Sequence, residues 1–169
     1  MPSNFLEDLV AEWYEYNGYF VKQNVRVGRR QKGGYESELD IVAFHPTQRH
    51  LVHVEPSMDA ESWAECEERY QKKFAAGRKH LPLLFLGMDL PDHIEQIALL
   101  GFASKKGRDR VGGGKIMLVE ELLERIVREF ARREEGNIMI PEQHPILRTF
   151  QLVADYRDAV LRALSRREA

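Results

Sequence analysis

Four polar residues stand inside two runs that otherwise have the character of β-strands. The segment SELDIVAFHPTQRHLVHVEPSM, residues 37–58, holds Glu38, Asp40, Glu55 and Ser57, and the polar turn HPTQR separates its two apolar runs. This pattern predicts an antiparallel hairpin. If the turn centres between residues 47 and 48, Asp40 faces Glu55 and Glu38 faces Ser57. Because side chains alternate with period two, all four then project from one face.

Two carboxylates that face each other destabilise a sheet unless something compensates their charge. A divalent cation would do so, and hard oxygen ligands without a thiolate suit Mg²⁺ or Mn²⁺. In the alternative interpretation, the turn is irregular and the acids reach solvent from an exposed face. Apolar residues on both faces of the two runs favour a covered sheet and hence the metal site; these residues are Leu39, Ile41, Val42, Ala43, Val52 and Val54.

The surrounding elements must position this hairpin. Apolar spacing predicts a helix over residues 4–17, and alternation predicts a strand in YFVKQNVRVG, residues 19–28. After the hairpin we expect a charged helix over 59–76 that ends at Gly77, a buried strand LLFLG over 83–87, and a helix PDHIEQIALLG that Pro91 opens. A strand IMLV, a helix over 119–134 and a last helix from about Ile146 follow. The order predicts a mixed α/β sandwich around one sheet, in a single domain over 1–169 with a helical extension at 142–169.

In order and spacing, the helix with Glu7 and the segments NGYFVKQNVRVG, ESELDIVAF and LVHVEPS resemble the core of the PD-(D/E)XK nuclease superfamily. The branch of small endonucleases related to Holliday junction resolvases is especially similar. The resemblance covers residues 4–90 and implies a restriction endonuclease-like, three-layer sandwich with a mixed central β-sheet flanked by helices. It also implies Mg²⁺-dependent hydrolysis of DNA, with Glu7, Asp40 and Glu55 as metal ligands and the backbone carbonyl of Pro56 as a further one.

Ser57 departs from that family, which has a lysine at this position that orients the attacking water and stabilises developing charge. Three interpretations remain open. A cation from elsewhere takes the lysine's place, or the fold binds without cleaving, or Ser57 serves mainly to start the next helix, which Ser57 or Asp59 would cap. The candidate cations are Lys22, Arg69, Lys72 and Lys73. We assign the catalytic role to Asp40, Glu55, Ser57 and Lys72, and give Glu38 either an outer role beside the metal ligands or an ordinary surface pair.

Two Gly-rich loops, RVGRRQKGG and KKGRDRVGGGK, hold nine of the 25 Lys and Arg residues. Such loops beside a metal site suit contacts to a phosphate backbone, and we assign nucleic-acid binding to Arg29, Arg30, Lys32, Lys105, Lys106 and Arg108. The alternative is that both loops are simply solvated. The second loop lacks the Walker pattern because Asp109 and Ile116 break it, so nucleotide hydrolysis is excluded. His53 shares a strand face with Glu55 and could touch the site, although a hydrogen-bonded core histidine is the simpler interpretation.

Composition agrees with a globular protein of 169 residues, with 43% hydrophobic and 31% charged residues and a net charge of −2. The single cysteine, Cys66, excludes an internal disulfide and a thiolate metal site, and we expect a cytoplasmic protein without a membrane span. The last helix is apolar on more than one side, which suggests either packing across the sheet or contact with a second subunit in a homodimer. We therefore expect a metal-dependent nuclease acting on DNA; the alternative is a catalytically silent module of the same fold that binds nucleic acid or a protein.

Overall fold

The computed structural model describes residues 4–59, 61–101, 104–132 and 139–165. The chain divides into two compact units, residues 1–119 and 120–169. The first unit contains the sheet and the carboxylate hairpin, and the second is helical. No helix among these residues combines the length and the apolar character needed to cross a membrane.

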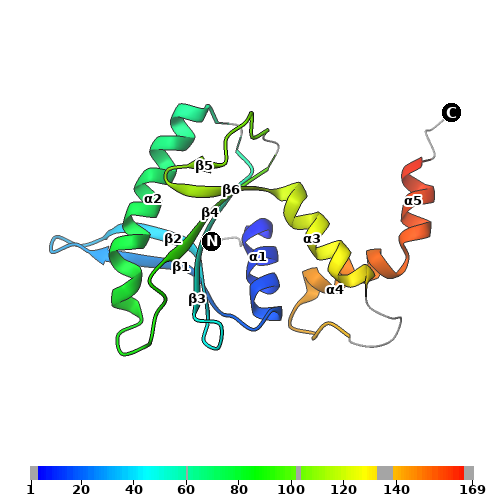
Figure 1. The fold of residues 1–169 in the computed structure, drawn as a ribbon, viewed down its shortest axis with the longest axis horizontal. Helices are drawn as coiled ribbons and strands as arrows, with labels where there is room; N and C mark the ends of the chain where they lie inside the picture. The colour runs from blue at the N-terminus through cyan, green and yellow to red at the C-terminus, as the bar shows by residue number, and fades with distance from the viewer. Residues whose placement is uncertain (1–3, 60, 102–103, 133–138, 166–169) are drawn as a thin grey trace. The chain divides into compact units, whose positions relative to one another are not determined.

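The first unit is built on a mixed six-stranded sheet with the order β1-β2-β3-β4-β6-β5 (Figure 1). Its strands are β1 (Phe20–Arg29), β2 (Tyr35–His45), β3 (His50–Ser57), β4 (Ile94–Leu100), β5 (Arg110–Val111) and β6 (Gly114–Leu118). Strands β1, β2 and β3 are antiparallel neighbours, whereas β3, β4 and β6 run parallel. The parallel strands are buried on both faces, as the apolar residues of β4 and β6 require.

Two helices cover opposite faces of this sheet, which confirms the predicted α/β architecture of three layers (Figure 1). Helix α1 (Phe5–Tyr16) begins at Asn4, whose side chain accepts a hydrogen bond from the Leu6 amide. Helix α2 (Trp63–Leu84) begins with a capping box, in which the Ser62 and Glu65 side chains each bind the other's backbone N–H. The predicted caps of α2, Ser57 and Asp59, are therefore wrong by several residues.

The segment between α2 and β4 also differs from its prediction. The predicted end of the helix at Gly77 and the predicted strand at 83–87 are wrong, because α2 continues to Leu84 and the chain then turns. The predicted helix at 91–101 is wrong as well, since Ile94–Leu100 forms strand β4. Short apolar runs do not distinguish a buried strand from a helix end, and only pairing with β3 and β6 decides the matter.

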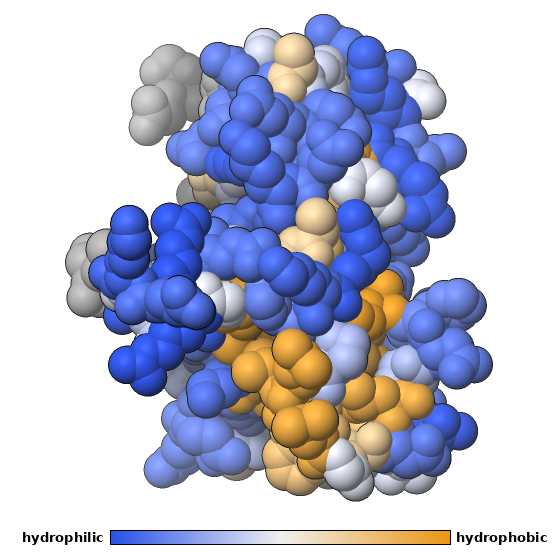
Figure 2. Space-filling view, turned by 90° about the vertical axis from the view of Figure 1, so that its left-hand side faces the viewer, coloured by the Kyte–Doolittle hydropathy of each residue, from blue (hydrophilic) through white to orange (hydrophobic). Residues whose placement is uncertain are grey.

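The residues after α2 leave an apolar area on the surface of the first unit (Figure 2). A shallow hollow there is bordered by residues of β1, β2 and the end of α2: Phe20, Val21, Lys22, Val25, Val42, Leu84 and Phe85. Leu83, Leu86 and Met88 are exposed in the same segment, so LLFLG is not a buried strand.

The β1–β2 hairpin extends past the rest of the sheet (Figure 1). Pairing between β2 and β3 covers Ile41–His45, whereas β1 and β2 pair as far as Arg29 opposite Tyr35. The outer part of the hairpin is therefore a two-stranded ribbon whose turn holds a basic loop.

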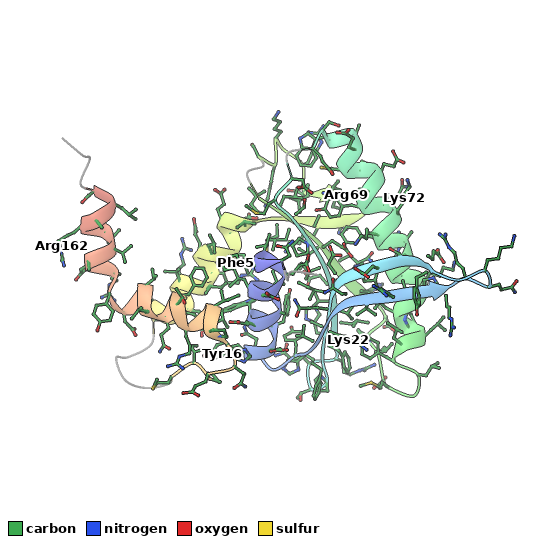
Figure 3. The ribbon with its side chains drawn as sticks, turned by 180° about the vertical axis from the view of Figure 1, so that it is seen from behind. Phe5, Tyr16, Lys22, Arg69, Lys72 and Arg162 are labelled. Carbon is green, nitrogen blue, oxygen red and sulfur yellow. The ribbon has the colours of Figure 1, made fainter. Side chains whose placement is uncertain are left out.

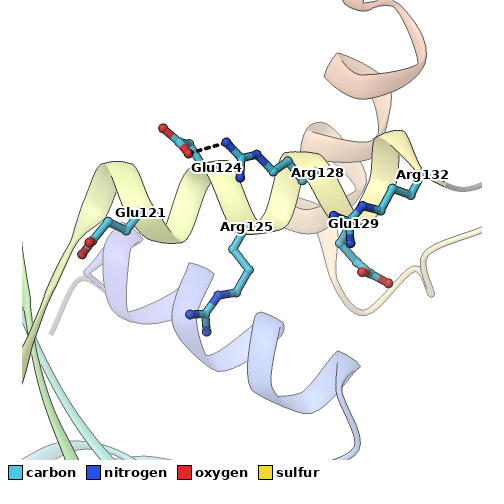
Figure 4. A pocket seen from close by; sticks show the side chains of 6 residues that line it. All are labelled: Glu121, Glu124, Arg125, Arg128, Glu129 and Arg132. Atoms are coloured by element: carbon cyan, nitrogen blue, oxygen red, sulfur yellow. Dashed lines mark hydrogen bonds and ion pairs between the residues drawn. The ribbon is translucent and has the colours of Figure 1, made fainter.

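The second unit consists of α3 (Val119–Ala131), α4 (Pro145–Asp155) and α5 (Arg157–Ser165). The helix predicted over 119–134 is confirmed as far as Ala131, and residues 133 and 134 lie outside the described part of the chain. The predicted last helix is divided at Tyr156. Figure 4 shows the polar side of α3, which carries three acids and three arginines among the labelled residues, and Glu124 pairs with Arg128 at 3.0 Å. Both partners are mostly exposed, so this face is a solvated helix surface rather than a binding site.

Candidate active site

The hairpin brings Asp40 and Glu55 together, as the sequence predicts. The observed register pairs Ile41 with Val54 and His45 with His50, which is the register expected from the turn position. One residue beyond that ladder, the Asp40 amide donates to Glu55 Oε1 at 3.1 Å. The Glu55 carboxylate thus takes the place of a strand carbonyl where β2 and β3 separate.

Lys73 of α2 lies between the two carboxylates. Its Nζ is 2.7 Å from Asp40 Oδ1, 2.8 Å from Glu55 Oε2 and 2.7 Å from the Glu38 carbonyl oxygen. An ammonium group has three donors, and these contacts use all of them. The Lys73 side chain is 27% exposed, so the cluster is only partly shielded from water.

Together, burial and neighbouring charges raise the pKa of Asp40, Lys73 and Glu7. The pKa of Asp40 rises from 3.8 to about 7, first because the carboxyl is buried and then because the Glu55 carboxyl is adjacent. Burial lowers the pKa of Lys73, but the charges of Glu55 and Asp40 outweigh it, so the net shift is upward. Burial and the charge of Asp40 raise the pKa of Glu7, which places that predicted ligand within electrostatic reach of the site.

Lys72, to which we assigned a catalytic role from the sequence, does not lie at the carboxylate pair. Lys72 points away from the sheet on the outer side of α2 and pairs with Glu68 at 2.7 Å (Figure 3). Arg69 binds Asp59 and Glu61 instead of the carboxylate pair, and Lys22 is exposed on β1. Among the four candidate cations, Lys73 is therefore the one that reaches the site.

Glu38, Pro56 and Ser57 have more peripheral places. The Glu38 side chain pairs with Arg26 at 3.0 Å on the surface, so the surface-pair interpretation is confirmed and only its backbone carbonyl contacts Lys73. Ser57 is buried, and its Oγ accepts from the Asp59 amide at 3.1 Å, which ends the strand. Pro56 lies in β3 opposite Leu99 of β4, and its role as a carbonyl ligand stays a prediction.

Two further residues lie behind the carboxylates, and both interpretations of His53, a contact to the site and a hydrogen-bonded core histidine, are confirmed. His53 Nε2 lies 2.7 Å from Glu55 Oε1, and the ring is completely buried. The Tyr70 hydroxyl donates to the Glu55 carbonyl at 3.3 Å, and burial raises its pKa. Burial also lowers the pKa of His53 to about 3, so the imidazole is neutral. The alternation of β3 indicates that His53 and Glu55 share a face, but the sequence has no signal for Tyr70.

Within the described part of the chain, no group of three or more His, Cys, Asp or Glu side chains is arranged to hold a metal ion. The chemistry of the donors nevertheless fits a hard cation. Asp40 and Glu55 provide adjacent oxygen ligands, and burial together with the neighbouring Glu55 raises the pKa of Asp40 even with Lys73 beside it. A divalent cation would favour the ionised forms of both groups.

The predicted nucleic-acid-binding residues occupy two separate loops. Arg29, Arg30 and Lys32 are exposed at the turn of the β1–β2 ribbon. The second loop lies beside the start of α2, where the Arg108 guanidinium stacks over the Trp63 ring at 4.8 Å; Lys106 is exposed and Lys105 is partly buried. The ribbon contacts the other part of α2 through Lys79 and His80, which both bind Glu36.

Comparison with known proteins adds little to this description. No family model and no curated protein matches the chain. A solved structure described as the crystal structure of a protein of unknown function, AF1548, is similar over 92% of this chain and 97% of its own, with 16% identity and a TM-score of 0.48.

Proposed function

We propose that this protein is a metal-dependent nuclease that hydrolyses phosphodiester bonds in DNA, with Lys73 in place of the lysine that Ser57 replaces. The observation that carries the proposal is the position of Lys73, whose ammonium binds both Asp40 and Glu55. The absence of a strand lysine was the main objection to catalysis, and the covering helix provides the same charge at the same two carboxylates.

Each residue has a distinct role in this proposal. Asp40 and Glu55, with Glu7 nearby, would hold Mg²⁺ or Mn²⁺, which supplies a water of lowered pKa and polarises the phosphate. The Lys73 ammonium adds positive charge beside the carboxylates, where it stabilises the charge that develops on phosphate oxygens. Because the side chain is 27% exposed, this charge can face a substrate at the surface.

The basic loops support a long polyanionic substrate. One loop contacts α2 at Trp63 and the ribbon contacts it at Lys79, with Lys73 between them. Sixteen residues of helix span about 24 Å at 1.5 Å per residue. At 3.4 Å per base pair, this corresponds to about seven base pairs of duplex. Positive charge on both sides of the carboxylates would hold the backbone across the site.

A second function has one specific observation in its favour. The three donors of Lys73 are all satisfied by Asp40, Glu55 and the Glu38 carbonyl, so an ammonium group already occupies the place between the carboxylates. This arrangement suits a module that binds nucleic acid through its basic loops without cleaving it.

Adjacent lysines give a matched experiment. We would measure nicking of plasmid and branched DNA with Mg²⁺ or Mn²⁺, comparing wild type with Lys73→Gln, Lys72→Gln and Asp40→Asn. We expect Lys73→Gln and Asp40→Asn to lose about a hundredfold or more in kcat, the usual effect of removing a transition-state contact. Lys72→Gln should change kcat less than about twofold because its side chain lies outside the site.

Two outcomes would overturn the nuclease. Equal cleavage by wild type and Asp40→Asn would show that another protein or another site is responsible. A wild type that binds DNA, with a salt dependence that weakens when Arg29 and Arg30 are replaced, but never cleaves it would favour the binding module.

A further inference from the structure

A chain of polar side chains lies behind the carboxylate pair and crosses three elements. Arg78 Nη1 of α2 is 2.7 Å from Gln96 Oε1 of β4. Gln96 Nε2 is 3.1 Å from His53 Nδ1 of β3, and His53 Nε2 is 2.7 Å from Glu55 Oε1. Gln96 is 7% exposed and His53 is 0% exposed, so the middle of this chain is shielded from water.

The direction of each hydrogen bond follows from its ends. A guanidinium only donates, so Gln96 Oε1 must accept from Arg78. The amide nitrogen of Gln96 lies 2.9 Å from the Phe74 carbonyl, which only accepts, and this contact requires the same orientation of the amide. Gln96 Nε2 therefore donates to His53 Nδ1, and the imidazole carries its proton on Nε2. That proton points at Glu55 Oε1.

Packing holds the imidazole in this position. A Cβ added to Gly77 would lie 2.4 Å from His53 Nδ1, so α2 passes over the ring only because residue 77 has no side chain. The ring also packs edge-on against Phe74, with centroids 5.4 Å apart and an interplanar angle of 90°. This explains why a glycine that resembles a stop signal lies within α2.

We infer that Arg78, Gln96 and His53 form a positioning relay that fixes the rotation of the Glu55 carboxylate. Oε1 receives two donors, His53 Nε2–H and the Asp40 amide, so Oε2 is the oxygen that faces Lys73. The relay reaches Glu55 through Oε1, whereas Lys73 binds Oε2. The catalytic consequence of the relay rests on the proposed nuclease function, whereas its hydrogen-bond pattern does not.

The isosteric change Gln96→Glu tests the relay directly. A carboxylate has only acceptors, so it requires a proton on His53 Nδ1, opposite to the wild-type pattern. The ¹⁵N chemical shifts of the His53 ring measure where the proton resides. We expect the Nε2–H tautomer in the wild type and a protonated Nδ1 in Gln96→Glu, with Gln71→Glu, an exposed site on α2, identical to wild type.

Arg78→Met provides a second variant that changes an exposed side chain and leaves the buried ones in place. Without the guanidinium, one of the two restraints on the Gln96 amide is lost, and we expect the His53 shifts to move towards a mixture of tautomers. A wild-type Nδ1–H tautomer, or His53 shifts that neither variant changes, would overturn the relay whether or not the protein cleaves DNA.

Cleavage kinetics then test the consequence for Glu55. We expect Gln96→Glu to lower kcat at least tenfold with the KM for DNA nearly unchanged, because the basic loops are intact. A tautomer change with unaltered kcat would overturn the positioning role. If the wild type cleaves no DNA under any metal condition, the nuclease proposal fails, and the ¹⁵N shifts alone decide the relay.

Discussion

Burial of the Asp40 carboxyl in the site should lower the free energy of unfolding, and Asp40→Asn should reveal by how much. An acid whose pKa is higher in the folded state keeps a proton that the unfolded chain releases. Between pH 4 and pH 7 the folded state therefore binds more protons, and the free energy of unfolding falls as the pH rises through this window. Asparagine resembles the protonated carboxyl and has no such loss.

The structure sets the magnitude of this effect. A rise of the Asp40 pKa from 3.8 to about 7 corresponds to a loss of about 4 kcal/mol in unfolding free energy across the whole window. From pH 5 to pH 8 the loss is about 3 kcal/mol, since the unfolded acid is already mostly ionised at pH 5. The Asp40 side chain is 20% exposed, so these figures are upper limits. Lys73 keeps Glu55 and the Glu38 carbonyl in the variant, which limits any opposing loss.

Urea unfolding at several pH values between 5 and 8 measures the difference. Tryptophan fluorescence is a suitable probe because both tryptophans of the chain, Trp13 and Trp63, lie in the unit that contains the site. We expect Asp40→Asn to gain stability over the wild type progressively from pH 5 to pH 8, by about 2–3 kcal/mol in total. Asp89→Asn is the control, because that side chain is 79% exposed in a surface pair with Arg49.

Parallel stability curves for wild type and Asp40→Asn would refute this reasoning. A constant difference would mean that Asp40 binds the same number of protons in both states, so that Lys73 compensates it fully. A variant that becomes less stable with rising pH would mean that the Lys73–Asp40 attraction exceeds the cost of burial. Either result would also weaken the argument that a divalent cation binds at Asp40 and Glu55.

Three further changes test other parts of the site. The double variant Ser57→Lys, Lys73→Met should have a kcat at least tenfold higher than Lys73→Met alone, because the strand then provides the charge. Equal kcat for the single and the double variant would contradict the proposal that one lysine replaces the other. Gly77→Ala should lower the free energy of unfolding by about 1–3 kcal/mol, measured by urea denaturation, because its Cβ would overlap His53. Glu38→Gln should leave kcat unchanged and alter stability by less than about 1 kcal/mol, since its side chain belongs to an exposed pair; a large loss of activity would assign it a direct role.

The hairpin could be predicted because its information is local. Apolar alternation and a short polar turn fix the register, and the register brings Asp40 beside Glu55. The α/β class follows from the order of elements for the same reason. The β1–β2 ribbon could also be predicted, from its two alternating segments and the glycines between them.

The rest depends on contacts between distant segments. Lys72 and Lys73 are adjacent on a charged helix, and their roles differ only because successive residues point about 100° apart; the phase of α2 is set by Tyr70 and Phe74, which pack on the sheet. Strand β4 was mistaken for a helix because its seven residues have no alternation when both faces are buried. The role of Gln96 depends on its hydrogen bond to His53, which lies 43 positions earlier in the sequence.

The serine at position 57 is compatible with catalysis once the charge is placed on α2. In place of a strand lysine, Ser57 ends β3 by accepting a hydrogen bond from the Asp59 amide. Lys73 reaches the same carboxylates from above, and the helix that carries it also contacts both basic regions, at Trp63 and at Lys79. A charge carried by α2 therefore stands on the same element as the contacts to both basic regions, which a charge at position 57 of β3 would not.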